Sequence, residues 1–362
     1  MSDLLRVAAA ARAFEAPGEF QRAERYGSGH IHDTWCATFA GGGVTRRMIL
    51  QRINTVIFAN PIAVMQNIER VTAHLHSGVA GAADVDRRVL RLIPARNGGS
   101  WHVDRNGGYW RAYWFIEGAS TFDTVRSPRQ AFEAARAFGE FQRQLADLPG
   151  PRLHESIAGF HDTARRFAAF EQTLGADAAG RSMAAQDEIA FAMARKPLAL
   201  ALLSAGLPER VTHNDTKLNN VLLDDATGEG ICVIDLDTVM PGLAAYDFGD
   251  MVRTMTCPAA EDEHDASRVA MDFELFESVL RGYLGGAASF LTASERKSLI
   301  IGAKVIVFEQ GIRFLADYLA GDIYYKVSRP EQNLDRCRTQ FKLLESIEKQ
   351  ESAMTRLLRA LA

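Results

Sequence analysis

The distribution of apolar positions divides the chain into a first part built of short strands and a second part built of helices. Between residues 20 and 118, apolar residues alternate or run in short blocks separated by glycine-rich turns. After a short N-terminal amphipathic helix, this pattern predicts an antiparallel sheet of about five strands, interrupted by one helix that begins at Pro61. From Pro128 onward, apolar residues recur at spacings of three and four, as in packed helices. The pattern therefore predicts an α+β protein with a small antiparallel sheet lobe and a larger, mainly helical lobe.

A change of pattern near Gly118 marks the boundary between the two lobes. The blocks RRVLRLIPA, SWHVD and GGYWRAYWFIEG follow the Pro61 helix and are expected to complete the sheet. The last block ends at Gly118, and a loop separates it from the next long helix. A chain of 362 residues exceeds what one compact core usually supports. We therefore expect an N-terminal lobe over residues 1–118 and a C-terminal lobe over residues 119–362.

Residues 211–237 depart from the helical pattern and are predicted to form a strand hairpin. His213, Asp215 and Asn220 lie in the loop before its first strand, and Asp235 follows its second strand. Phosphoryl transfer needs one carboxylate at the acceptor hydroxyl, and an amide and a second carboxylate to hold Mg²⁺. Asp215 is therefore the candidate catalytic base, and Asn220 and Asp235 are the candidate magnesium ligands.

Two simpler interpretations compete with this assignment. Asp and Asn side chains often cap helices and turns, but capping does not explain a histidine and a strand-end aspartate in the same arrangement. Asp247, Phe248 and Gly249 spell the metal-binding triplet of protein kinases, but no strand delivers Asp247, whereas a strand delivers Asp235. We expect Asp247 to fix its own loop by packing or hydrogen bonding.

Gly27, Ser28 and Gly29 form the turn between the first two predicted strands and are candidate contacts for nucleotide phosphates. Glycines let the backbone approach a ligand closely, so the amide groups of this turn could face phosphate oxygens. A plain hairpin turn explains the same three residues, and the motif alone favours that interpretation.

The sheet lobe supplies two further candidate contacts for the nucleotide. Arg52 ends the third strand, where a kinase-like lobe keeps a basic residue for the phosphates, and Glu69 on the following helix could pair with it. In a two-lobed kinase, residues 115–118, including Glu117, would form the hinge, where backbone groups rather than side chains hold adenine. These elements predict ATP and Mg²⁺ as the cofactors.

Composition narrows the class of partners. The chain has 45 Asp and Glu residues against 41 Lys and Arg, for a net charge of −4. We therefore expect no basic surface for nucleic acid, and no apolar run could span a bilayer. The first residues lack the continuous apolar stretch of a signal peptide. Four cysteines without paired spacing are typical of a reducing cytoplasm. We therefore expect a cytoplasmic protein with a small-molecule substrate. The composition does not determine the oligomeric state and is compatible with a monomer.

The hairpin motif resembles that of the aminoglycoside phosphotransferase and choline kinase-like superfamily, which has a protein-kinase-like two-lobed fold. The match is closer to one branch, the N-acetylhexosamine 1-kinases. Four stretches are similar to that branch: GSGHIHDTW, ILQRINTVIF, THNDTKLNNVLLD with VIDLDTVMPG, and RFLADYLAGDIYYKV followed by RTQFKLLESI. They run from residue 27 to about residue 347, so the resemblance covers nearly the whole chain.

The resemblance implies ATP-dependent phosphorylation of the anomeric (C1) hydroxyl of N-acetylglucosamine or N-acetylgalactosamine. Asp215 would be the base, and Asn220 and Asp235 would be the magnesium ligands. Arg313 and Tyr324 fall in the block associated with sugar contact, and a guanidinium and a phenol suit hydroxyl and acetamido oxygens. His32 departs from the family pattern, because an asparagine is expected there in the phosphate loop.

Two alternatives remain open at this level. The acceptor could be another small alcohol, such as choline, an amino alcohol or an aminoglycoside. A choline site would favour an aromatic cage, and an aminoglycoside site would favour a patch rich in Asp and Glu. The fold could also serve as a binding module without activity, but the intact set of Asp215, Asn220 and Asp235 argues against that.

Overall fold

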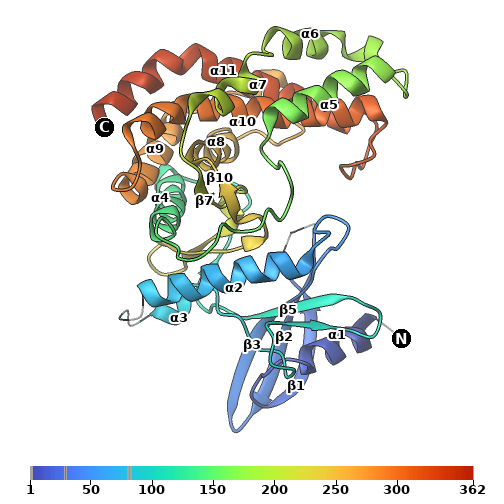
Figure 1. Ribbon diagram of the computed structural model, residues 1–362, viewed down its shortest axis with the longest axis vertical. Coiled ribbons are helices and arrows are strands. Elements are labelled where there is room, and N and C mark those ends of the chain that lie inside the picture. The colour runs from blue at the N-terminus through green and yellow to red at the C-terminus, as the bar shows by residue number, and fades with distance from the viewer. Residues whose placement is uncertain (1–2, 28, 30, 80, 82–83, 362) are drawn as a thin grey trace.

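The chain folds into two lobes, one around an antiparallel sheet and one around helices (Figure 1). The computed structural model describes residues 3–27, 29, 31–79, 81 and 84–361. This arrangement confirms the α+β, two-lobed architecture that the sequence predicted. Within the described residues, every helix is too short or too polar to span a bilayer. All four cysteines carry free thiols, as their spacing indicated.

The sheet lobe contains five antiparallel strands among the described residues, in the order β1-β2-β3-β5-β4. They are β1 (Glu19–Arg25), β2 (Asp33–Gly41), β3 (Val44–Arg52), β4 (Trp101–Val103) and β5 (Tyr109–Trp114). The expected number of strands is therefore correct, but the block RRVLRLIPA is not one of them. Its first two residues end the short helix α3 (Val85–Arg88), and the rest joins the sheet through an isolated bridge between Leu92 and Tyr113. Arg87 donates to the carbonyl oxygens of residues 117 and 118, so this segment covers the hinge instead of extending the sheet.

The alternation of side chains on the strands gives the sheet two different faces. One face packs against α1 (Asp3–Arg12) in a core that includes Trp35, Met48, Leu50 and Trp110. The residues between them in sequence, such as Ile49, point to the opposite face, towards the second lobe. The sheet therefore buries one side in its own core and offers the other side to the space between the lobes.

Helix α2 (Pro61–Gly78) lies between the sheet and the helical lobe (Figure 1). Asn60 caps its first turn and Pro61 occupies the first helical position, as the sequence predicted. Although α2 belongs to the first part of the chain, its buried residues join the core of the helical lobe. Asn67 also donates to the carbonyl oxygens of His154 and Val239. The helix thus connects the two lobes.

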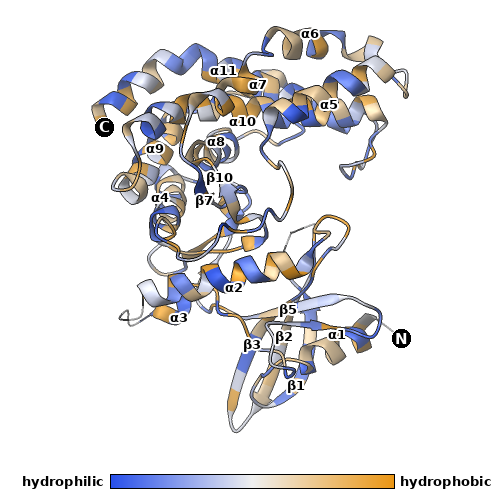
Figure 2. Ribbon diagram, in the orientation of Figure 1, coloured by the Kyte–Doolittle hydropathy of each residue, from blue (hydrophilic) through white to orange (hydrophobic). Residues whose placement is uncertain are grey.

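The helical lobe is organised around α10, along which hydrophobic residues gather (Figure 2). Its helices are α4 (Pro128–Gln144), α5 (Thr163–Ala176), α6 (Gln186–Ala194), α7 (Leu198–Ala201), α8 (Ala244–Met255), α9 (Phe273–Ala287), α10 (Ala293–Ala320) and α11 (Gln332–Leu361). Helices α5, α8 and α11 pack against α10, and α4 packs against α9. Thr292 and Glu295 form a capping box that starts α10.

The predicted hairpin lies where the helical lobe faces the sheet. It consists of β8 (Val221–Asp224) and β9 (Gly230–Val233), and β6 (Ala119–Ser120) adds a third strand. The loop before β8 is anchored at its start by β7 (Arg210–Thr212), which pairs with β10 (Met240–Gly242). Two small antiparallel sheets thus hold both ends of the segment that carries the candidate catalytic residues.

Candidate active site

Buried polar contacts with neighbouring segments fix the loop that carries Asp215. His213 is fully buried and donates from Nε2 to the carbonyl oxygen of Ile234, at 2.9 Å, while its Nδ1 accepts from the Asp215 N–H. The carboxylate of Asp247 accepts from the backbone N–H groups of His213 and Asn214, at 2.8 and 2.7 Å. Asn214 has a φ of 65°, a conformation that asparagine tolerates better than most residues. The two residues that precede Asp215 in the loop are therefore held in place by hydrogen bonds.

Asp247 makes structural hydrogen bonds, as expected, but they hold the loop that carries Asp215 and not its own loop. It is fully buried on α8, and Gln142 also donates to its carboxylate, at 2.6 Å. Gly249 permits the close approach of α8 to α10, because a Cβ at this position would lie 2.4 Å from the carbonyl oxygen of Gly302. The Asp-Phe-Gly triplet thus supports the catalytic loop from the helix behind it.

Replacing Asp247 with alanine is expected to lower the free energy of unfolding by about 3 kcal/mol, because two buried N–H groups would lose their acceptor. Urea unfolding measures this change, and Asp86→Ala, at an exposed aspartate, is the matched control. Magnesium affinity of the folded variant should stay at the wild-type value. A variant with wild-type stability and lost magnesium affinity would instead make Asp247 a metal ligand.

Asp215 is surrounded by groups that favour its charged form. Its Oδ2 atom accepts from Lys217 Nζ and from Asn220 Nδ2, each at 2.9 Å. Burial raises the pKa of Asp215, but the Lys217 ammonium and the Asn220 amide outweigh burial and keep this pKa below its ordinary value. The carboxylate is therefore ionised at neutral pH and can accept a hydrogen bond from an acceptor hydroxyl.

The sequence analysis missed Lys217, although its position two residues after Asp215 was a usable signal. Lys217 pairs with Asp215 and lines two cavities. Asn219 also lines both cavities. Burial lowers the pKa of Lys217, but the carboxylates of Asp215 and Asp235 outweigh it and raise this pKa overall. The ammonium group is thus charged and lies between the two cavities.

Replacing Lys217 with methionine is expected to lower kcat about 100-fold, because a preorganised positive charge near the transferred group is lost. Steady-state kinetics with varied nucleotide should show a smaller change in KM than in kcat. Lys196→Met, which removes an exposed lysine paired with Glu171, is the matched control. Wild-type kcat in the Lys217 variant would exclude a role for this charge in the reaction.

Asn220 and Asp235 lie side by side at the end of the hairpin. The Ile234 N–H donates to the Asn220 carbonyl oxygen at 2.9 Å, and both Asn220 and Asp235 line the same cavity. Asn220 Nδ2 is engaged by Asp215, which leaves the amide oxygen as its free acceptor. Asp235 adopts a left-handed φ of 60° two residues after the end of β9. An amide oxygen and a carboxylate form the all-oxygen donor set that Mg²⁺ prefers.

The charge on Asp235 is unfavourable in the protein alone. Burial raises its pKa to about 6, and the carboxylates of Asp237 and Asp215 add to this effect. A cation bound at this position would relieve both the burial and the repulsion. The electrostatics of the site therefore fit the predicted metal.

Asp237 lies beside Asp235 but is already engaged. Arg111 donates to its two carboxylate oxygens, at 2.6 and 2.5 Å, and His32 Nε2 lies 3.3 Å from Oδ2. Burial raises the pKa of Asp237, but Arg111 and His32 outweigh it and hold this pKa well below its ordinary value. His32, Asp235 and Asp237 approach one another closely enough to hold a metal ion. The Arg111 contact leaves Asp235 as the better-placed ligand of the two aspartates.

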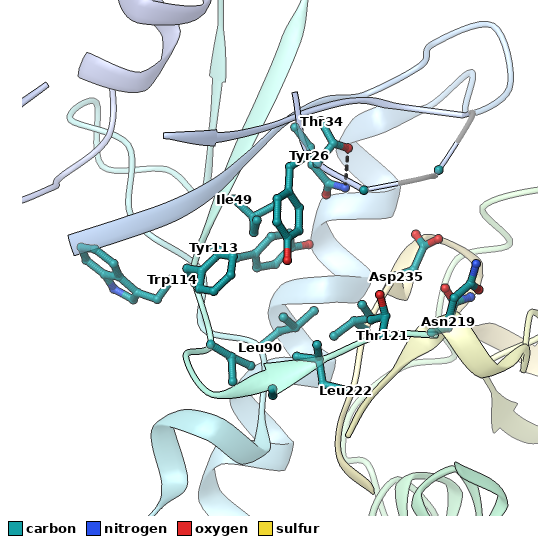
Figure 3. A pocket seen from close by; sticks show the side chains of 18 of the residues that line it. Tyr26, Thr34, Ile49, Leu90, Tyr113, Trp114, Thr121, Asn219, Leu222 and Asp235 are labelled. Atoms are coloured by element: carbon teal, nitrogen blue, oxygen red, sulfur yellow. Dashed lines mark hydrogen bonds between the residues drawn. The ribbon is translucent and has the colours of Figure 1, made fainter. Parts of the chain in front are cut away.

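A cavity of about 200 Å³ opens between the sheet lobe and the hairpin (Figure 3). Tyr26, Ile49 and Tyr113 line it from the sheet, and Leu222 lines it from the hairpin. Figure 3 shows Asp235 and Asn219 at one end of the cavity, away from Trp114 at the other end. Apolar walls with polar groups at one end are suited to a ligand with a flat apolar part and a charged part.

Not all of the sequence-predicted nucleotide residues reach this cavity. Gly27 and Gly29 line it, and Ser28 lies outside the described residues. Arg52 does not line it, because the alternation along β3 places Gln51 on the cavity side and Arg52 on the other, 3.8 Å from Asp33.

The expected partner of Arg52 also differs from the prediction, whereas the position of Glu117 leaves open only the backbone role that was expected of the hinge. Glu69 accepts from the Ser100 hydroxyl instead of pairing with Arg52. At the hinge, Phe115 and Ile116 line the cavity, whereas the exposed side chain of Glu117 pairs with Arg47. Any contribution of Glu117 would therefore come from its backbone.

Arg313 and Tyr324, the two residues expected to contact a sugar, lie near the end of α10 and in the loop that follows. Arg313 donates to Gln310 and lies over the rings of Phe160 and Tyr325. The Tyr324 side chain is 64% exposed. Neither residue lines the two cavities that meet at Lys217. The structure thus keeps the two residues near each other but outside the cavity walls.

Comparison with known proteins agrees with this geometry. The family model described as the phosphotransferase enzyme family matches residues 22–283. The solved structure of a microcompartment-associated aminopropanol kinase superposes with a TM-score of 0.59 at 16% identity, covering 97% of this chain and 98% of that chain. A choline kinase from Cryptosporidium parvum gives a TM-score of 0.56 at 13% identity, with 99% of both chains covered. Spectinomycin phosphotransferase, solved with ADP and spectinomycin, gives 0.56 at 13% identity, with 96% and 99% covered.

These identities are low, so the superpositions show a shared fold, and the family model covers most of the chain. The fold is the protein-kinase-like arrangement of an antiparallel-sheet lobe and a helical lobe. The protein belongs to the phosphotransferase enzyme family.

Proposed function

We propose that the protein transfers the γ-phosphoryl group of ATP to the anomeric hydroxyl of an N-acetylhexosamine, N-acetylglucosamine or N-acetylgalactosamine. The observation that carries the phosphoryl-transfer part is that Lys217, Asn220 and Asp235 line the cavity between the lobes and that Lys217 and Asn220 both donate to Asp215. The sugar part rests on the family resemblance of the sequence and on the charge of the second cavity.

The cavity between the lobes is the proposed nucleotide site. Its apolar walls suit the adenine ring, and the backbone of Phe115 and Ile116 lies at the hinge, as expected for adenine recognition. Gly27 and Gly29 lie in the same wall, where the backbone can approach phosphate groups. The related spectinomycin phosphotransferase was solved with ADP, which supports a nucleotide here. Asn220 and Asp235 would hold Mg²⁺, which neutralises phosphate charge when it is bound.

The second cavity, of about 410 Å³, is the proposed acceptor site. It lies between the catalytic loop, the end of α8 and α11. Among its described lining residues, two cations (Lys217 and Arg253) balance two acids (Asp123 and Glu261), and none of these lining residues is aromatic. A quaternary amine would favour an aromatic cage and a polycation would favour an acidic wall. The balanced wall therefore supports a neutral, polar acceptor such as a sugar.

The proposed sugar contacts lie outside the walls of this acceptor cavity, and only charge effects connect their neighbourhood to it. Glu261 in the cavity wall interacts electrostatically with Tyr325, and Arg253 in the same wall does so with Arg313. Arg313 and Tyr324 are therefore proposed to reach the sugar from the α10 side, and the assignment still rests on the resemblance.

In the proposed reaction, Asp215 accepts the proton of the anomeric hydroxyl as the hydroxyl oxygen bonds to the γ-phosphorus of ATP. The bond from that phosphorus to the β,γ-bridging oxygen breaks, and ADP leaves with the bonding electrons. An anomeric hydroxyl is more acidic than an ordinary alcohol, so a carboxylate with a low pKa is an adequate base. Lys217 holds the Asp215 carboxylate and presents positive charge towards the transferred group. Asn220 orients Asp215 through its amide. Positioning and charge neutralisation thus provide most of the catalysis.

A panel of acceptors with Mg-ATP, followed by ADP release, tests this proposal. N-acetylglucosamine and N-acetylgalactosamine should turn over, with kcat/KM at least 100-fold above those of choline, aminopropanol and spectinomycin. Turnover of an amine acceptor without turnover of either sugar would refute the sugar assignment and retain the kinase. If none of the acceptors in the panel raises ADP release above the solvent background, both acceptor classes are refuted.

A further inference from the structure

A buried ion pair joins the two lobes at the wall of the proposed nucleotide cavity, which Arg111 lines. Arg111 lies on β5 of the sheet lobe, and Asp237 lies in the short 3-10 turn Leu236–Thr238 that follows β9. Their side chains are 1% and 3% exposed, and two parallel hydrogen bonds connect them. This bidentate geometry is the most specific that an arginine and a carboxylate can form.

The sheet side of this pair is fixed by its neighbours. Gln51 on β3 is the register partner of Arg111, and its side-chain oxygen accepts from Arg111 Nε at 2.9 Å. His32 accepts the Asn54 N–H at Nδ1, so its Nε2 carries the proton and donates towards Asp237. His32 also stacks on Phe58, with ring centroids 5.3 Å apart. The residue that departs from the family pattern thus belongs to the surroundings of Asp237.

The helical side of the pair is the turn that carries Asp235. Asp237 is two residues from Asp235, which has a left-handed backbone conformation. Such a conformation in a residue other than glycine persists only where the surrounding structure imposes it. Backbone contacts of Ile234 with Asn220 and of Val239 with Leu236 hold the two ends of this turn. The Arg111–Asp237 pair holds its centre from the opposite lobe.

A buried ion pair is by itself weak evidence for stability, because apolar residues of similar volume often stabilise a fold as well or better. The location of this pair points to a different use. The basic residue expected at the end of β3 faces away from the cavity, whereas Arg111, in register with Gln51, lines it. The positive charge of the sheet lobe therefore reaches the site from β5 and binds the metal-carrying turn.

We propose that Arg111 is a positioning residue that holds Asp237 and, through it, sets the orientation of Asp235 for binding of the metal–nucleotide complex. In this arrangement Asp237 is the counter-ion of Arg111 and leaves the metal to Asp235 and Asn220. The inference rests on the proposed nucleotide site and extends it to a residue from the opposite lobe.

Binding of Mn²⁺ in the presence of ADP, followed by electron paramagnetic resonance, tests the inference without the acceptor. Arg111→Met and Arg111→Lys should each weaken Mn²⁺ binding at least tenfold, because a lysine cannot make two parallel hydrogen bonds. Adenosine affinity, measured by calorimetry, should change less than twofold. Arg22→Gln, at an exposed arginine of the same sheet, is the matched control and should bind as the wild type does.

The double variant Arg111→Met/Asp237→Leu separates positioning from folding. It replaces the buried pair with an apolar one, so its Tm should recover to near the wild-type value. Mn²⁺ binding should remain at least tenfold weaker than in the wild type. If Arg111→Met alone fails to fold, Arg111→Lys and the double variant carry the test.

Three outcomes decide between the inference and the function on which it rests. Wild-type Mn²⁺ affinity in Arg111→Lys, or recovery of both Tm and Mn²⁺ affinity in the double variant, would overturn the positioning role. Equal loss of adenosine and Mn²⁺ binding in folded Arg111→Lys would also overturn it, because the cavity itself would have changed. A wild-type protein that binds neither adenosine nor ADP would instead refute the proposed nucleotide site.

Discussion

Replacing Asp215 with asparagine is expected to lower kcat about 1,000-fold, because the acceptor hydroxyl loses the base that takes its proton. Asparagine has the shape of aspartate, so the loop should keep its course, and ADP affinity should change less than threefold. Lys217 would lose its counter-ion, so a small decrease in Tm is also expected. Single-turnover measurements at saturating acceptor would isolate the chemical step from binding.

A nearby carboxylate controls for a general loss of charge. Asp225, exposed in the turn of the same hairpin, is replaced in Asp225→Asn, which should have wild-type kcat. A value of kcat within tenfold of the wild type in Asp215→Asn would remove Asp215 as the base. Catalysis would then rest on positioning of the substrates and on neutralisation of phosphate charge alone.

Replacing Asp235 with asparagine is expected to lower kcat/KM for Mg-ATP about 1,000-fold, because the metal loses its charged protein ligand. The same variant should be at least as stable as the wild type at pH 7. Burial raises the folded-state pKa of Asp235 to about 6, above its unfolded value, so its charged form opposes folding as pH rises through this window. Thermal unfolding should therefore give an equal or higher Tm for Asp235→Asn.

The pH dependence of metal binding gives a second readout for Asp235. A proton and a metal compete for the carboxylate, so Mg²⁺ affinity of the wild type should decrease as pH falls through about 6. Unchanged Mg-ATP kinetics in Asp235→Asn, together with a lower Tm, would show that Asp235 is a structural residue. The metal would then have to be reassigned, with Asp237 as the next carboxylate on the turn.

The structure of the hairpin segment was predictable because the patterns that indicate it lie within the segment itself. The strands β8 and β9, the loop before them and the position of Asp235 after the second strand follow from patterns within residues 211–237. The same logic favoured Asp235 over Asp247 as the candidate metal ligand, because a strand end brings a side chain to the edge of a hairpin. The structure places Asp247 on α8, under the loop.

Contacts between the lobes were not predictable, because they depend on strand faces and pairing partners. A shift of one residue reverses the face on which a strand side chain lies, so Arg52 was expected where Gln51 is found. Arg111 is far from Asp237 in sequence, and no local pattern joins them. The apolar face of α2 does not indicate which lobe the helix packs against. Only its tertiary contacts show that it joins the core of the helical lobe.

The central claim is phosphorylation of the anomeric hydroxyl, and a matched pair of acceptors tests it most directly. N-acetylglucosamine and its 1-O-methyl glycoside differ only in whether the C1 oxygen can accept a phosphoryl group. With Mg-ATP, we expect ADP release and a sugar 1-phosphate from N-acetylglucosamine, identified by coupling of its ³¹P resonance to the anomeric proton. The methyl glycoside should give no product. Phosphorylation of the methyl glycoside at a rate similar to that of the free sugar would contradict the claim and move the reaction to another hydroxyl.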